Sequence, residues 1–149
     1  MRKLVAPMAL TVLVCGGGDL EVRAQRSMAD EVAERPAAVH EVRMVLNDAG
    51  EYRYVPDKLT IKVGDTVRWV LVSGGPHNVQ FKPDRIPDGA AEVLDAAMEN
   101  KIGPINGQLL MAPNSAYEIS FEGAPVGEYY YVCTPHELLQ MVATLTIEQ

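Results

Sequence analysis

Apolar and polar positions alternate with a period of two along most of the chain after residue 38. This period is typical of half-buried β-strands, because successive side chains of a strand point to opposite faces of a sheet. Turn signals such as Gly64-Asp65 separate the alternating segments. The expected strands cover residues 40–46, 52–55, 59–63, 66–72, 77–81, 117–121, 127–132 and 141–147.

We therefore predict an all-β domain over residues 39–149, a Greek-key β-sandwich of seven to eight antiparallel strands. One stretch, residues 86–100, lacks the alternation and contains good helix formers between Ala90 and Met98. Gly103 and Pro104 follow this stretch and stop it. We expect one short helix, or a loop with helical turns, in this part of the chain.

The first residues have the pattern of an export signal rather than of a folded domain. Arg2-Lys3 precedes an apolar run over residues 4–14, which is too short to span a membrane. One route of processing removes residues 1–24 by cleavage before Gln25. The other ends the signal before Cys15, because residues 13–16 resemble a lipoprotein box, and attaches a lipid anchor to Cys15. Both routes export the domain, with residues 25–38 as a flexible linker.

Length and charge exclude several classes of protein. The chain has 149 residues, which is enough for one ordinary domain, and 48% of them are apolar. Its net charge is -7 and it has no basic cluster, so we expect no nucleic-acid partner. We expect a monomer that works outside the cytoplasm, in the periplasm or an equivalent compartment.

The cysteine count points to a thiol with a special role. If Cys15 is removed or lipidated, Cys133 is the single remaining cysteine of an exported protein. Such a cysteine has no disulfide partner and is a candidate for a reactive or metal-ligating thiol. The alternative is a buried, inert cysteine that serves as a small apolar side chain. The cysteine alone does not decide between them.

Its neighbours favour a metal site. Cys133, His136 and Met141 fall within nine residues, and His77 follows a Gly-Gly-Pro turn upstream. Two imidazoles, one thiolate and one weak thioether are the ligands of a type 1 (blue) copper centre. Strand alternation turns Cys133 and Met141 inward, toward the core. His40 has no such neighbours and is interpreted as a histidine without a role in the site.

Two other interpretations remain open at this point. Cys133 and His136 have a spacing that also occurs in half of a zinc site, although no second cysteine is close and zinc does not favour a thioether. The domain would otherwise be a metal-free structural sandwich. The sequence shows no acid/base pair and predicts no substrate pocket, so we do not expect an enzyme and assign no catalytic residue.

Several motifs resemble the plastocyanin family of cupredoxins, the small type 1 copper proteins. The similarity runs from about residue 55 to residue 147 and ends on the spacing Cys-x2-His-x4-Met; its other segments are residues 62–69, 75–81, 86–89 and 127–131. The resemblance implies that His77, Cys133, His136 and Met141 bind one copper ion. It also implies that Asn78 ties the His77 loop to the loop of Thr134.

The same resemblance implies a function. The protein would carry single electrons between redox partner proteins, with the exposed edge of His136 as the route. A copper-binding or copper-delivery protein of the cell envelope is the alternative.

Two departures from the family pattern lie close to the expected site. Val132 stands where plastocyanins have a tyrosine, and residues 137–140 replace a small, glycine-rich loop. The second change places Leu138 and Leu139 beside His136. These two leucines either form a docking patch for a partner or pack inward.

Overall fold

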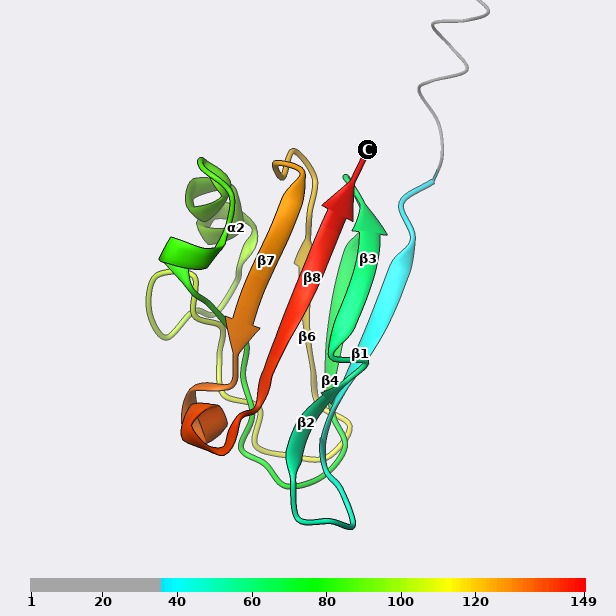
Figure 1. Cartoon of the computed structure of the whole chain (residues 1–149), viewed down its shortest axis with the longest axis vertical. Helices are drawn as coiled ribbons and strands as arrows, with labels where there is room; N and C mark the ends of the chain where they lie inside the picture. The colour runs from blue at the N-terminus through cyan, green and yellow to red at the C-terminus, as the bar shows by residue number, and fades with distance from the viewer. Residues whose placement is uncertain (1–35) are drawn as a thin grey trace, which may run out of the picture. The chain divides into compact units, whose positions relative to one another are not determined.

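Two four-stranded sheets pack face to face in the computed structural model, which describes residues 36–149 (Figure 1). The expected signal peptide, Cys15 and residues 25–35 of the expected linker lie outside the described residues. In sheet order, the first sheet contains β2 (Tyr52–Val55), β1 (Val39–Leu46), β4 (Thr66–Leu71) and β6 (Ala116–Ser120). In the same way, the second sheet contains β3 (Lys58–Lys62), β8 (Val142–Glu148), β7 (Gly127–Val132) and β5 (Gln80–Phe81).

The alternating apolar residues of both sheets fill the space between them. Trp69 of β4 lies edge-on to Phe81 of β5 and to Tyr131 of β7, with ring centroids 6.4 and 5.6 Å apart. Tyr129 and Leu145 face the same interior from β7 and β8 and are fully buried. Each of these large aromatic rings removes much apolar area from water when it is buried. The predicted β-sandwich is confirmed.

The prediction that all strands are antiparallel is wrong for two pairs. β1 runs parallel to β4, and β3 runs parallel to β8. In both cases the chain passes through the opposite sheet before it returns, as a parallel neighbour requires a crossover. Alternation reports which face of a strand is buried, but it is the same for either strand direction, so the pattern could not reveal this.

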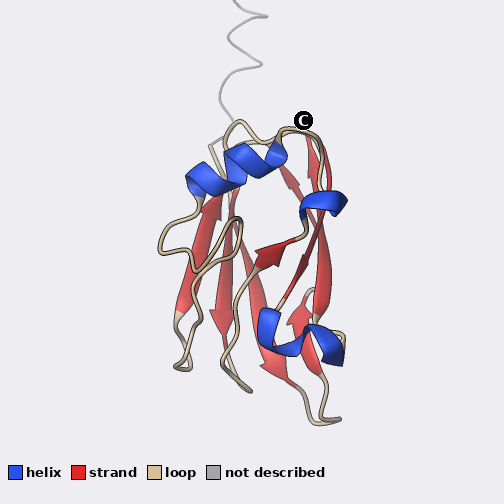
Figure 2. Ribbon diagram, turned by 90° about the vertical axis from the view of Figure 1, so that its left-hand side faces the viewer, coloured by secondary structure: helices blue, strands red, loops and turns tan. Residues whose placement is uncertain are grey.

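The helical segments are short and lie near the two ends of the sandwich (Figure 2). The expected helix is α2 (Ala90–Ala97), which buries Ala90 and Leu94 and follows a 3-10 turn, η1 (Pro83–Arg85). A second 3-10 segment, η2 (Thr134–Leu139), occupies what the sequence predicted as a plain loop. None of the helices in residues 36–149 is long and apolar enough to cross a membrane.

Strand β5 is shorter than the pattern predicted. Only Gln80–Phe81 pairs with β7, whereas His77 forms an isolated bridge with Leu110. The segment before β5 therefore leaves the sheet and turns toward η2, which joins β7 to β8 at the end of the sandwich opposite the C-terminus (Figure 1). Because His77 leaves the regular pairing of the sheet, its ring lies next to that of His136 in η2.

Candidate metal centre

Three donor side chains from two distant parts of the chain meet at this end of the sandwich. Cys133 follows β7, His136 lies in η2, and His77 lies between β4 and β5. The Cys133 Sγ atom is 3.6 Å from His77 Nδ1 and 3.5 Å from His136 Nδ1. All three potential ligand atoms lie within 4.8 Å of one another, and all three residues are buried. The structure thus brings together three of the four residues singled out for their donor chemistry.

The fourth residue, Met141, is held to the same loop by its backbone. Its N–H donates to the carbonyl oxygen of His136 at 3.2 Å, and its own carbonyl accepts from the Cys133 N–H at 3.0 Å. The Met141 side chain is fully buried. These bonds close the turn between β7 and β8, and the Met141 side chain is buried in the core, as strand alternation predicted.

A backbone carbonyl fixes the imidazole of His77. The His77 Nε2 atom lies 2.8 Å from the carbonyl oxygen of Ser73, which accepts a hydrogen bond and therefore places the ring proton on Nε2. Nδ1 then keeps its lone pair and faces the Cys133 sulfur. Burial lowers the pKa of His77, so the neutral ring is favoured. The ring is thus in the tautomer that binds a metal through Nδ1.

The glycines before His77 allow its loop to approach β1 and β4 closely. Gly74 has a φ of 75°, and a Cβ atom built there would collide with the Cβ of Leu46. A Cβ atom on Gly75 would lie 2.8 Å from Leu71 Cδ1. Glycine has no Cβ atom, so it lets the backbone lie this close to Leu46 and Leu71 without displacing them.

Burial raises the pKa of the Cys133 thiol, since an isolated thiolate is poorly solvated in the core. The backbone amides of Asn78 and His136 oppose this effect and lower the pKa through hydrogen bonds. A bound metal cation would make the thiolate favourable here, because a metal-bound thiol is deprotonated outright. The environment therefore suits a metal-bound sulfur better than a free one.

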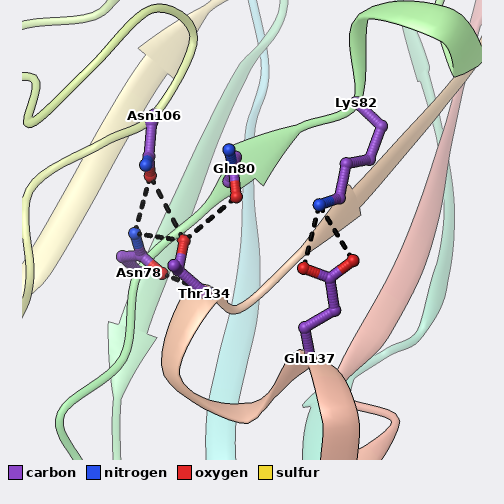
Figure 3. Close-up of polar contacts among 6 residues, drawn as sticks. All are labelled: Asn78, Gln80, Lys82, Asn106, Thr134 and Glu137. Atoms are coloured by element: carbon purple, nitrogen blue, oxygen red, sulfur yellow. Dashed lines mark hydrogen bonds and ion pairs between the residues drawn. The ribbon is translucent and has the colours of Figure 1, made fainter.

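The side chain of Asn78 joins the His77 loop to the Cys133 loop, as the resemblance implied (Figure 3). Its Oδ1 atom accepts from the Thr134 N–H at 2.8 Å. Its Nδ2 atom donates to Asn106 Oδ1 at 2.8 Å, to Thr134 Oγ1 at 3.2 Å and to the Gly107 carbonyl at 3.3 Å. One buried amide thus fixes three loops around the donor cluster.

Two neighbours of the cluster were not found from the sequence. Tyr52 stacks on the His136 ring, with centroids 3.8 Å apart and an angle of 10° between the planes. Lys82 forms an ion pair with Glu137, the residue after His136. Alternation could have placed Tyr52 on one face of β2, but nothing in the pattern showed that β2 begins beside η2.

His40 is not part of the donor cluster, in agreement with the prediction that it has no role in the site. Its Nε2 atom lies 2.8 Å from Asp65 Oδ2. The Asp65 carboxylate also accepts hydrogen bonds from the backbone N–H groups of Ala38 and Lys62. His40 therefore helps to fasten the start of β1.

The donor set fits copper. Two imidazole Nδ1 atoms and one thiol sulfur are soft or intermediate donors, and the buried thioether of Met141 lies on the same loop. No carboxylate belongs to the metal-ligand cluster found among residues 36–149, and hard cations that prefer oxygen would find no ligand in it. A structural zinc site would instead use four strong donors.

Comparison with known proteins agrees with this chemistry. Residues 40–148 match the model of the copper-binding proteins of the plastocyanin/azurin family. A plastocyanin of Prochlorothrix hollandica is 34% identical over 149 residues, covering 99% of this chain and 95% of that protein. A plastocyanin of a Synechococcus strain is 41% identical over 101 residues, which cover 68% of each protein. The chain belongs to the plastocyanin/azurin family of copper-binding proteins.

Solved structures show the same relationship. The oxidised plastocyanin of Dryopteris crassirhizoma superposes with a TM-score of 0.57 at 28% identity, over 72% of this chain and 99% of that one. An amicyanin variant in the reduced Cu(I) form gives a TM-score of 0.51 at 27% identity, over 78% of this chain and 88% of that one. The cofactor of this protein is accordingly copper, in a cupredoxin fold.

Proposed function

We propose that this protein is an electron carrier that exchanges one electron at a time with redox partner proteins through a type 1 copper centre. His77, Cys133 and His136 would hold the copper ion as its strong ligands, and Met141 would add a weak thioether donor. The observation that carries the proposal is the convergence of three buried donors within 4.8 Å. When bound, copper supplies a couple that changes by a single electron.

The protein's own contribution is a site that keeps its shape. The Ser73 carbonyl holds the His77 ring, Tyr52 stacks on the His136 ring, and Asn78 joins the loops that carry both. Side chains held by packing and hydrogen bonds move little when the charge at the site changes. Small movement means a small energy of rearrangement, which favours fast electron transfer and offers nothing to a covalent reaction. No catalytic role is proposed.

The surface beside His136 supports contact with another protein. His136 is 8% exposed, whereas the Leu138 and Leu139 side chains are 95% and 58% exposed. The inward-packed alternative for the two leucines is therefore wrong. Apolar side chains beside a slightly exposed ring allow a partner to approach the site and exclude water from the contact.

Replacing Leu138 with serine is expected to slow electron transfer to the partner roughly three- to tenfold, because partial burial of a leucine on docking is lost. Val126→Ser is the matched control, since Val126 is exposed in the turn before β7, at the end of the sandwich where β7 begins. The visible spectrum and reduction potential should be the same in both variants. If stopped-flow measurements gave unchanged bimolecular rates for Leu138→Ser, this surface would have no role in docking.

Copper delivery is the alternative use of the same ligands, and the two functions differ in a measurable way. A carrier shows a reversible one-electron wave in voltammetry and retains its copper in both oxidation states. A delivery protein releases Cu(I) readily to a competing chelator. The burial of all three strong donors favours retention. Loss of copper on reduction would refute the carrier.

We also propose that the protein acts outside the cytoplasm and as a monomer. The basic residues Arg2-Lys3 and the apolar run that follows support export, either as a soluble protein processed before Gln25 or with a lipid on Cys15. Export is compatible with the thiol of Cys133, because Cys133 is buried and is the one free cysteine among residues 36–149, so this part of the chain needs no disulfide in an oxidising compartment.

A further inference from the structure

A row of polar side chains on one segment contacts the loop that carries His136. Asn78, Gln80 and Lys82 occupy alternate positions of an extended segment, so their side chains point the same way. The Thr134 hydroxyl donates to Gln80 Oε1 at 3.2 Å, next to its bond with Asn78. Lys82 pairs with Glu137 (Figure 3). The row thus holds the loop at two points, one before His136 and one directly after it.

The pair between Lys82 and Glu137 is closer than a usual surface contact. The Lys82 Nζ atom lies 2.8 Å from Glu137 Oε1 and 2.9 Å from Oε2, so one ammonium group serves both oxygens. The lysine side chain is 24% exposed and the glutamate side chain 42% exposed. Hydrogen bonds between charged groups are about twice as strong as neutral ones.

The part of the loop after His136 has little apolar packing. Leu138 and Leu139 are exposed, and Gln140 adopts a left-handed conformation with a φ of 63°. This segment depends on backbone bonds, such as those from Gln140 N–H to the Glu137 carbonyl and from Met141 N–H to the His136 carbonyl. A side-chain bond at Glu137 therefore stabilises the part of the loop that has the least apolar packing.

We propose that Lys82 is a positioning residue, whose ion pair with Glu137 keeps His136 in one place during electron transfer. The inference rests on the proposed function, because it takes His136 as a copper ligand. Lys82 does not touch the donor atoms; it acts through Glu137. The contacts of Thr134 and Glu137 with this row show that it faces η2.

Two single variants separate positioning from a simple charge effect. Lys82→Met and Glu137→Gln both break the ion pair, but they change the net charge of the protein in opposite directions. In electron self-exchange, a reduced molecule passes one electron to an oxidised molecule of the same protein. A charge effect between these like-charged molecules would slow one variant and speed the other. Positioning slows both.

The expected result is a fall of about three- to tenfold in the self-exchange rate of both variants, from the loss of a partly buried charged pair. Nuclear magnetic resonance line broadening measures this rate. The conservative variant Lys82→Arg should keep the wild-type rate, since it keeps the cation. Lys101→Met is the matched control, because its pair with Asp95 has similar exposure, 28% and 44%, and does not involve the ligand loop.

A second readout does not depend on electron transfer. The amide hydrogens of Gln140 and Met141 should exchange with solvent faster in Lys82→Met and Glu137→Gln than in the wild type, and at the wild-type rate in Lys82→Arg and Lys101→Met. Opposite shifts in self-exchange, or unchanged amide exchange, would overturn the positioning role. Failure of the proposed function is distinct, since it would appear as absence of a copper–thiolate band in the wild type itself.

Discussion

Met141→Leu is expected to raise the reduction potential while the protein keeps its copper. The thioether would be a weak donor that stabilises Cu(II) more than Cu(I), so its removal would disfavour the oxidised form. Leucine is similar in volume and apolar, and a swap of this kind in a core costs less than about 1.5 kcal/mol of stability. Voltammetry of the copper-loaded variant checks the direction of the shift.

Met98→Leu provides the control for this prediction. Met98 is 3% exposed and belongs to the same core, but it lies after α2, in a segment that supplies none of the proposed ligands. Its replacement should leave the potential unchanged. An unchanged or lowered potential for Met141→Leu would show that Met141 does not act as a weak copper ligand, whatever its position in the loop.

Asn78→Ala is expected to lower the free energy of unfolding by about 2–4 kcal/mol, because it leaves buried polar groups without partners. The variant loses the bonds of the Asn78 side chain to Asn106, Gly107 and Thr134. The loops of His77 and Cys133 are no longer joined by this amide, so copper should also dissociate faster. Denaturant unfolding and competition with a chelator measure the two effects.

The turn between β1 and β2 offers a matched asparagine. Asn47 also makes several side-chain bonds, accepting from the N–H groups of Ala49 and Glu51 and donating to the Glu51 carboxylate, but it is exposed. Water can replace these bonds, so Asn47→Ala should cost less than about 1.5 kcal/mol. Equal losses in the two variants would mean that Asn78 has no special role at the site.

Sequence reasoning reached the donors because their chemistry is local. Cys133, His136 and Met141 lie within one short loop, and strand alternation correctly turned the first and last of them inward. The burial of Tyr129, Tyr131, Leu145 and Ile147 follows the same alternation along β7 and β8. What a period of two cannot encode is the direction of a neighbouring strand, and for this reason the parallel pairs β1–β4 and β3–β8 were missed.

The surroundings of the donors depend on contacts between distant segments. Tyr52 reaches His136 only because β2 begins beside η2, and Lys82 reaches Glu137 only because β5 lies next to β7. Neither contact leaves a periodic signal in the sequence. The exposure of Leu138 and Leu139 was undecided for a related reason, since a 3-10 turn has no fixed buried face at this length.

A titration with Cu(II) under oxidising conditions, monitored in the visible range, tests the central claim most directly. The wild-type protein should develop an intense thiolate-to-copper band that saturates at one equivalent, because Cys133 supplies the sulfur of the site. Cys133→Ser should show no such band, while its fold, followed by circular dichroism, is retained. A wild-type protein without the band, or a serine variant that keeps it, would contradict the assignment of a type 1 copper centre.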